Sequence, residues 1–364
     1  MYFKRGWKSL KLFPPGGKEG HVFISVIISA RNEEKNLASL LNDLSNQKYN
    51  RRNFEVIVVD DHSDDRTAEI VKSFNWVKLI SLSDHVNGQI NSYKKLAIET
   101  AISQSKGDLI VTTDADCRVN YLWLSTIASF AEASNSKMII MPVSFNYNPT
   151  FLGLFQILDF MSLQGITAAS VELKNPLMCN GANLAYKKSA FYEVNGFDGV
   201  NKTASGDDMF LLHKIAHQFP GSISYLKSND VIVYTDSMPS LNSFLHQRIR
   251  WAAKSNSYKN LKIKLILSFV YLFNLLLFIT PVLALIKPLT LTVSSGKILS
   301  AWVFILLLKT ITEMWFLKPV SRFFKYQNIM GFFPLAQPFH IIYTVVSGTL
   351  GFKSTYKWKG RTVK

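Results

Sequence analysis

Two acidic clusters, far apart in this chain of 364 residues, have side chains suited to chemistry. The first is Asp114-Ala115-Asp116, which follows an apolar run, and the second is Asp207-Asp208, which follows a glycine. Two carboxylates separated by one residue can share a hard divalent cation, which then bridges the oxygens of a nucleotide diphosphate and neutralises them. A carboxylate can also take a proton from a reacting hydroxyl. The clusters therefore indicate a metal–diphosphate clamp and a catalytic base.

Each cluster also has an ordinary structural interpretation. An Asp-x-Asp sequence by itself is more often a solvated turn, and Gly206-Asp207-Asp208 is suited to cap a helix that begins near Met209. The elements expected around the clusters decide between these interpretations.

Three short apolar runs rich in β-branched residues, at 23–29, 54–59 and 107–113, predict buried strands. Between the first two, segment 33–44 repeats leucine at helical spacing, with acidic residues near its start that favour the helix dipole. Another helical pattern follows the second strand, near residues 70–71. This alternation predicts a right-handed βαβ layer that binds ligands at the carboxyl ends of its strands.

Seven short motifs occur in an order that resembles the inverting family 2 glycosyltransferases with the GT-A fold. They are Ser29-Ala30-Arg31-Asn32-Glu33-Glu34, Val59-Asp60-Asp61-His62-Ser63, Lys94-Lys95-Leu96-Ala97, Asp114-Ala115-Asp116, Asn180-Gly181-Ala182-Asn183-Leu184, Gly206-Asp207-Asp208 and Gln247-Arg248-Ile249-Arg250-Trp251. The resemblance implies an α/β GT-A fold, a Rossmann-like mixed sheet that binds a nucleoside-diphosphate sugar, over residues 21–260. Residues 1–20 form a basic segment before it.

The resemblance also implies where the donor binds. Asp60 or Asp61 would accept hydrogen bonds from the base or ribose, and the small Ala30 would let backbone approach the ring. Lys94 would offer its charge to the diphosphate, although Tyr93 precedes it where the family usually has a glycine. A solvated surface lysine is the alternative. The implied donor-binding residues are Ala30, Arg31, Glu33, Asp60, Asp61, Lys94, Asp114, Ala115, Asp116, Gln247, Arg250 and Trp251, and the implied ligands of a divalent metal, Mg²⁺ or Mn²⁺, are Asp114 and Asp116.

For catalysis, Asp208 matches the general base of the family. It would take a proton from the acceptor hydroxyl while that oxygen attacks the anomeric carbon from the face opposite the nucleotide, which inverts the configuration. Asp207 would assist by raising the pKa of its neighbour, provided both face the cleft; the family usually has a glutamate there. Arg250 would pair with the diphosphate, and Trp251 would stack on the acceptor sugar or seat its helix on a membrane. The implied acceptor-side residues are Gly181, Ala182, Asn183 and Trp251.

The carboxyl-terminal tail is basic and apolar. Residues 261–364 contain 13 Lys and Arg and one acidic residue, Glu313, so the tail carries +12 of the formal net charge of +16. A near-balanced catalytic region joined to such a tail argues for an anionic membrane surface and against nucleic acid as the partner.

Two segments of this tail, 263–286 and 298–317, are long and apolar enough to span a membrane. Lys309 and Glu313 weaken the second segment but can neutralise each other at i,i+4 spacing. A third segment, 332–352, contains two prolines and has basic residues on both sides, so we expect it to be re-entrant or interfacial, with both chain ends cytoplasmic. The apolar stretch 151–163 is expected to be core, with a membrane-interfacial helix as the alternative.

These observations predict a multi-pass, inner-membrane glycosyltransferase with a cytoplasmic catalytic domain at 21–260, a membrane region at 261–352 and a basic tail at 353–364. Its expected donor is a nucleoside-diphosphate sugar, with UDP as the nucleotide, and its expected acceptor is lipid-linked or membrane-associated. The ending Trp358-Lys359-Gly360-Arg361 resembles ceramide, carotenoid and hopanoid glycosyltransferases. A processive polysaccharide synthase and an inactive membrane scaffold that retains the nucleotide fold are the alternatives.

Overall fold

The computed structural model describes residues 1–16, 20–85, 92–200, 206–257, 260–286, 295–352, 356–358 and 361–363. Its contacts divide the chain into two compact units. Unit 1 consists of Met1–Asn146, Leu163–Asp236 and Trp358–Lys364. Unit 2 consists of Tyr147–Ser162 and Ser237–Lys357.

Unit 1 is built on a seven-stranded mixed sheet with the strand order β3-β2-β1-β4-β7-β5-β8. The strands are β1 (Ile24–Ala30), β2 (Phe54–Asp60), β3 (Val77–Ser81), β4 (Leu109–Asp114), β5 (Met138–Ile140), β7 (Leu184–Lys187) and β8 (Ile223–Tyr225). Strands β1 to β4 pair in parallel, whereas β7 runs antiparallel to its neighbours β4 and β5. A separate parallel pair joins β6 (Val143–Phe145) to β9 (Val233–Thr235). The three strands predicted from the apolar runs are confirmed.

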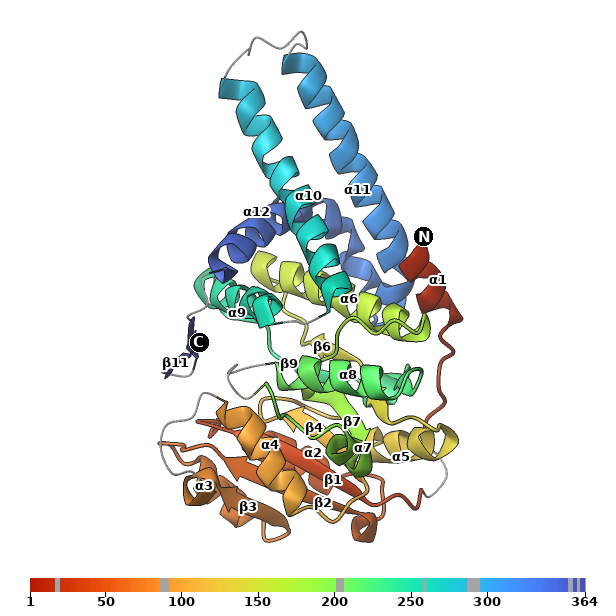
Figure 1. Ribbon diagram of the computed structural model, residues 1–364, viewed down its shortest axis with the longest axis vertical. Coiled ribbons are helices and arrows are strands. Elements are labelled where there is room, and N and C mark those ends of the chain that lie inside the picture. The colour runs from red at the N-terminus through yellow and green to blue at the C-terminus, as the bar shows by residue number, and fades with distance from the viewer. Residues whose placement is uncertain are drawn as a thin grey trace. The chain divides into compact units, whose positions relative to one another are not determined.

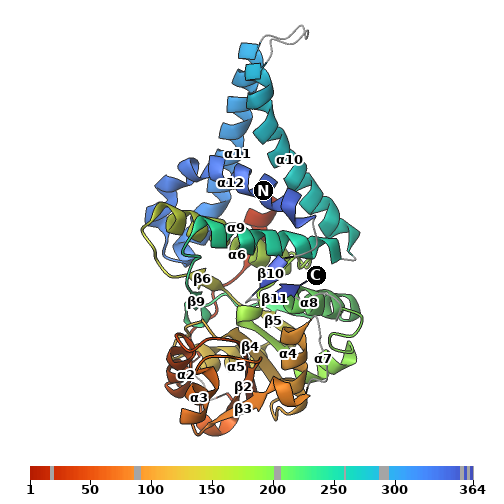
Figure 2. The ribbon, with the colours of Figure 1, turned by 90° about the vertical axis from the view of Figure 1, so that its left-hand side faces the viewer.

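Helices cover both faces of this sheet (Figure 2). The helix α2 (Leu37–Ser45) and the helix α3 (Thr67–Ser73) lie on one face, and α4 (Tyr93–Ser103) lies on the other. The remaining helices of unit 1 are α1 (Tyr2–Ser9), α5 (Trp123–Ala133), α7 (Lys188–Glu193), α8 (Asp207–Gln218) and the second half of α6 (Phe151–Glu172). The leucines that predicted α2 are all fully buried, as an amphipathic helix on a sheet requires.

The start of α2 differs from the prediction. The helix was expected from Glu33, but it begins at Leu37. The backbone N–H of Glu33 donates to Thr67 Oγ1 at 2.8 Å, and that of Glu34 donates to Asp65 Oδ2 at 3.0 Å. These residues therefore join two loops at the sheet edge instead of forming the first helical turn.

The strand register brings polar residues to one edge of the sheet. Strand β1 lies between β2 and β4, with Ala30 paired to Asp60 and Ser29 paired to Asp114. Because the three strands are parallel, Ala30, Asp60 and Asp114 all lie at their carboxyl ends.

Unit 2 contains the apolar helices of the carboxyl-terminal half. They are α9 (Leu241–Ala253), α10 (Leu261–Ile286), α11 (Ser295–Phe323) and α12 (Phe333–Gly351), together with the first half of α6. The long helices α10 and α11 lie side by side (Figure 1), and Trp302 Nε1 donates to the carbonyl of Leu277 at 2.8 Å. The predicted pair between Lys309 and Glu313 is confirmed at 2.9 Å, and Gln337 on α12 bonds to both side chains.

Four helices of the described chain are long and apolar enough to cross a membrane: Phe151–Glu172, Leu261–Ala284, Gly296–Phe323 and Gln327–Gly351. In the apolar window of the first helix, 67% of the residues are buried within the protein, compared with 11% in the second helix and 6% in the third. Burial by protein makes α6 a core helix, whereas α10 and α11 expose the apolar side chains that a bilayer would cover. The third predicted hydrophobic segment is a continuous helix, despite Pro338 inside it.

The boundary between the two units differs from the expected domain boundary. Residues 147–162 and 237–260 were assigned to the catalytic domain but cluster with the apolar helices. Within unit 2, Asp159 on α6 and Arg248 on α9 form a buried ion pair at 2.7 Å, with both side chains 3% exposed. Tyr343 on α12 donates to the same carboxylate. Half of the predicted basic tail at 353–364 lies outside the described residues, and the described half forms the paired strands β10 (Tyr356–Trp358) and β11 (Arg361–Val363).

Candidate active site

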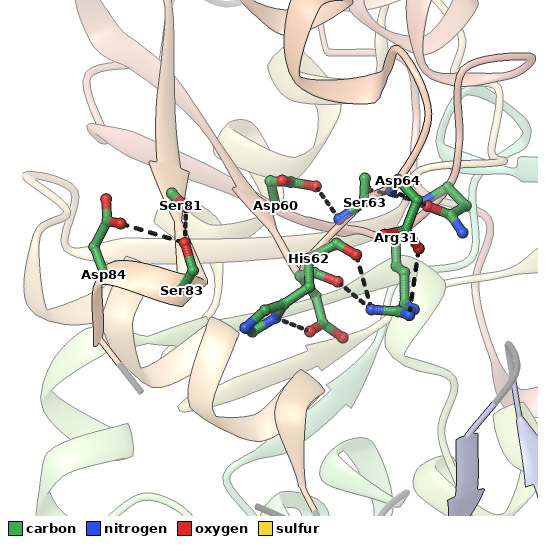
Figure 3. A network of polar contacts seen from close by, with 10 residues as sticks. Arg31, Asp60, His62, Ser63, Asp64, Ser81, Ser83 and Asp84 are labelled. Carbon is green, nitrogen blue, oxygen red and sulfur yellow. Dashed lines mark hydrogen bonds and ion pairs between the residues drawn. The ribbon is translucent and has the colours of Figure 1, made fainter. Parts of the chain in front are cut away.

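The loop that follows β2 is held by Arg31 (Figure 3). Its guanidinium donates to the carbonyls of Asp61 at 2.8 Å and His62 at 2.9 Å. His62 has a φ of 55°, a left-handed conformation that is uncommon for a residue other than glycine. The Asp60 carboxylate accepts a hydrogen bond from the backbone N–H of Ser63 at 3.3 Å. Arg31 thus positions this loop, and its direct contact with the donor stays a prediction.

The two carboxylates of this loop have different surroundings. Asp61 is 1% exposed and its Oδ1 lies 3.0 Å from Nδ1 of His62, whereas Asp60 is 9% exposed. The edge of the His62 ring meets the ring of Tyr93, with centroids 5.6 Å apart. Sequence reasoning missed the contribution of His62, which links this loop to the start of α4. Ala30 is buried beneath the loop.

The first acidic cluster begins on the last residue of β4. Asp114 has a side chain that is 39% exposed, Ala115 is buried, and Asp116 is exposed. Asp116 Oδ2 also accepts a hydrogen bond from Thr235 Oγ1 at 3.3 Å. Among the residues that the structure describes, no three His, Cys, Asp or Glu side chains gather to hold a metal. Two accessible carboxylates nevertheless fit a hard cation whose other ligands are phosphate oxygens and water.

Lys94 lies between the two acidic clusters. Its Nζ donates to Asp114 Oδ1 at 2.7 Å and lies 3.9 Å from Asp207 Oδ2. The lysine side chain is only 25% exposed and that of Asp207 only 10%. Burial lowers the pKa of Lys94, but the carboxylates of Asp114, Asp207 and Asp208 raise it more, so the net pKa lies above its ordinary value. Lys94 is therefore a charged ammonium inside the cluster, unlike the solvated surface lysine that was the alternative.

The second acidic cluster occupies the first turn of α8. Gly206 precedes this turn with a φ of 88°, which favours glycine. The Asp208 carboxylate accepts hydrogen bonds from the backbone N–H of Gly181 at 3.2 Å and from that of Met209 at 2.8 Å. Gly206 is the N-cap residue of α8 and makes no side-chain cap bond, so the expected carboxylate cap is not formed; Asp208 lies within the first turn and also contacts the Gly181 loop.

Gly181 lies against the carboxylates and the lysine. A Cβ built on Gly181 would be 3.4 Å from Asp207 Oδ2 and 3.8 Å from Lys94 Nζ. Any larger side chain at this position would extend among these charged groups. The tertiary fold therefore brings together five predicted site residues: Asp114 from β4, Lys94 from α4, Asp207 and Asp208 from α8, and Gly181.

Two predicted acceptor-side residues are buried instead. Asn183 is fully buried, and its amide donates to the carbonyls of Pro142 and Val231, both at 2.7 Å. Its side-chain oxygen accepts a hydrogen bond from Trp123 Nε1 at 3.1 Å. Ala182 is 4% exposed. Asn183 anchors the loop to the protein interior and Ala182 is buried there, whereas Gly181 is the member of the motif that reaches the carboxylates.

The sequence did not single out the residues that hold segment 196–200. Lys95 is 1% exposed and donates to the carbonyl of Val200 at 2.8 Å. Glu99 accepts a hydrogen bond from the N–H of Phe197 at 3.1 Å, and Lys214 donates to the carbonyl of Gly196 at 2.7 Å. The buried Lys95 cannot be distinguished from its partly exposed neighbour Lys94 by residue type alone.

The remaining predicted donor-binding residues are Gln247, Arg250, Trp251 and Glu33. Gln247, Arg250 and Trp251 lie on α9 in unit 2, where the Arg248 guanidinium stacks 4.2 Å from the Trp251 ring centroid. In unit 1, the Glu33 carboxylate accepts a hydrogen bond from the amide of Asn36. The donor-binding roles of Gln247, Arg250, Trp251 and Glu33 stay predictions.

Comparison with known proteins gives a consistent picture. Residues 25–194 match the family model described as glycosyl transferase family 2. The chain is 34% identical over 190 residues to the glycosyltransferase AglE of Haloferax volcanii, a match that covers 51% of this chain and 59% of that protein. It is also 34% identical over 166 residues to the 4,4'-diaponeurosporenoate glycosyltransferase of Staphylococcus haemolyticus, covering 45% of this chain and 42% of the relative. The matched part is thus about half of the length of each relative.

Among solved structures, a mannosyltransferase from Pyrobaculum calidifontis in complex with GDP-mannose and Mn²⁺ superposes with a TM-score of 0.59. The match covers 94% of this chain and 93% of that one at 16% identity. At this identity the likeness concerns the fold alone, and with the family match it confirms the GT-A fold class expected from the sequence.

Proposed function

Because residues 25–194 match the glycosyl transferase family 2 model, we propose that this chain transfers a sugar from a nucleoside-diphosphate donor to a lipid-linked or membrane-associated acceptor, with inversion at the anomeric carbon. The observation that carries the proposal is the position of Lys94, 2.7 Å from Asp114 and 3.9 Å from Asp207. This one side chain joins the carboxylates suited to a metal and diphosphate with the carboxylates suited to proton transfer.

The donor would bind along the carboxyl edge of β1, β2 and β4. Asp60 would accept hydrogen bonds from the base or ribose, on a loop that Arg31 holds in place. Asp114 and Asp116 would hold a divalent cation, Mg²⁺ or Mn²⁺, which when bound supplies charge neutralisation to the departing diphosphate. Lys94 would add a positive charge on the same side. UDP is the nucleotide we propose first.

Asp208 would act as the general base. Its carboxylate would accept the proton of the acceptor hydroxyl while that oxygen forms a bond to the anomeric carbon. The bond from the anomeric carbon to the diphosphate oxygen breaks in the same step, and the nucleotide leaves with the bonding electrons. The N–H of Gly181 orients the carboxylate, and Asp207, directly before Asp208 in the first turn of α8, keeps the site anionic.

Product analysis tests this proposal. Purified protein is incubated with extracted membrane lipids, Mn²⁺ and separate UDP- and GDP-sugars, and the lipids are analysed by mass spectrometry. We expect a lipid-soluble product heavier by one glycosyl residue. A ladder of many added residues would support the processive synthase instead, and an absence of product with every donor would support the inactive scaffold.

The membrane attachment gives a separate prediction. Because α10 and α11 expose long apolar surfaces, we propose that both span the bilayer, and we expect the protein to stay with membranes through a high-salt wash. Attachment through the basic tail alone would be screened, so release of the protein by salt would contradict the two spans. Immunodetection in the pellet and supernatant measures this.

Cysteine labelling tests the proposed cytoplasmic location of both chain ends. Cys117 is buried, so a Cys179→Ser background removes the more accessible native thiol. Ser9→Cys and Thr362→Cys then report the two ends to a membrane-impermeant reagent, and both should be protected in intact cells. Labelling of only the Thr362→Cys variant would favour three spans.

A further inference from the structure

The ammonium of Lys94 is hydrogen-bonded to a carboxylate oxygen of Asp114 to which the proposed metal would also bind. Its Nζ lies 2.7 Å from Asp114 Oδ1, within hydrogen-bonding distance, and no intervening atom separates the charges. A cation arriving at Asp114 must therefore compete with an ammonium that is tethered to the same site. A tethered competitor has a high effective concentration, which lowers the apparent affinity for the free cation.

The charges around Lys94 show what would release it. Three carboxylates, those of Asp114, Asp207 and Asp208, act on the charge of this ammonium. The nearest alternative, Asp207 Oδ2 at 3.9 Å, lies beyond hydrogen-bonding distance. A move of Lys94 from Asp114 to Asp207 would only exchange one carboxylate partner for another. A nucleotide diphosphate adds a new anion for the lysine at the same time as it adds ligand oxygens for the metal.

We infer that Lys94 acts as a tethered substitute for the metal on Asp114, so that metal and nucleotide bind to this enzyme as a mutually dependent pair. The inference rests on the proposed donor site and extends it to the order of binding. Lys94 leaves Asp114 for the diphosphate when both ligands are present, and returns when the nucleotide leaves. By linkage, the nucleotide raises metal affinity by the same factor by which metal raises nucleotide affinity.

Binding of Mn²⁺ alone tests this inference. Free Mn²⁺ is measured by electron paramagnetic resonance in titrations of the full chain, first without nucleotide and then with saturating UDP or GDP. For wild-type protein we expect weak binding of Mn²⁺ alone and a gain of about 5- to 150-fold with nucleotide, the usual range of coupling between two sites. In Lys94→Gln, Mn²⁺ alone should bind about tenfold more tightly, and the gain from nucleotide should fall.

Two control variants make the result specific. Lys72→Gln removes the same charge from an exposed position on α3 and should bind Mn²⁺ as the wild type does. Lys94→Arg keeps the charge and should keep the weak binding of Mn²⁺ alone. If Lys94→Gln binds Mn²⁺ alone no more tightly than the wild type does, the inference that Lys94 takes the place of the metal on Asp114 is wrong.

Asp114→Asn separates this inference from the proposed function. If this variant loses nucleotide-dependent Mn²⁺ binding while Lys94→Gln behaves as wild type, the metal site stands and only the role of Lys94 is wrong. If Asp114→Asn retains full nucleotide-dependent Mn²⁺ binding, the metal is not on Asp114, and both this inference and the proposed metal site on Asp114 are overturned.

Discussion

Replacement of Asp208 by asparagine is expected to lower the rate of sugar transfer roughly 10²- to 10⁴-fold, the usual contribution of a general base. Asparagine keeps the shape of the side chain, and its carbonyl oxygen can still accept the hydrogen bond from the N–H of Gly181. The amide cannot take a proton from the acceptor hydroxyl. Donor affinity should change little, because the base acts on the acceptor.

The measurement combines single-turnover transfer with calorimetry of nucleotide binding. Asp108→Asn is the matched control, since Asp108 is exposed and directly precedes the amino end of β4, the end opposite Asp114. Its transfer rate should equal that of the wild type. An Asp208→Asn protein that folds, binds donor and transfers at the wild-type rate would exclude Asp208 as the base.

The second large effect is expected at Asp116. The change Asp116→Asn removes one of the two proposed metal ligands but leaves the contact between Lys94 and Asp114 intact. We expect metal-dependent binding of the nucleotide to weaken strongly. Transfer should fall by at least about 10²-fold, because a bound cation contributes several kcal/mol of charge stabilisation in such reactions.

Calorimetric titrations with UDP, in Mn²⁺ and in a chelator, measure this effect. The wild type should lose affinity in the chelator, and Asp116→Asn should show the weak affinity in both conditions. The asparagine side chain keeps an oxygen that can accept the hydrogen bond from the Thr235 hydroxyl, so the fold should not change. Strong nucleotide binding by the variant that is independent of metal would rule out the clamp.

The sequence by itself predicted the elements that end at the site. Runs such as 54–59 are β-branched and apolar because both faces of a central parallel strand are buried, and this local pattern is legible without the fold. It placed Asp60 and Asp114 at strand ends, where the structure has them. The order of the motifs added the GT-A fold, which the comparisons confirm.

Other features depended on contacts between distant segments. The helix predicted from Glu33 begins at Leu37, and the backbone N–H groups of Glu33 and Glu34 instead donate to Thr67 and Asp65, which follow β2 in the chain. The apolar stretch 151–163 is the first half of a helix shared by both units, and a pair buried with Arg248 tied it to α9. Neither of these contacts has a signal in the local residue pattern.

The sequence alone determined which residue types could do chemistry and at which strand ends they lie, because hydrophobic periodicity is set by each element's own burial. Only the tertiary structure decided how they are used. It buried Asn183 and Lys95 beneath the site and placed Lys94 between Asp114 and Asp207. These outcomes depend on the packing of helices and strands that are far apart in the chain, and the type of a side chain does not indicate which distant partner that packing supplies.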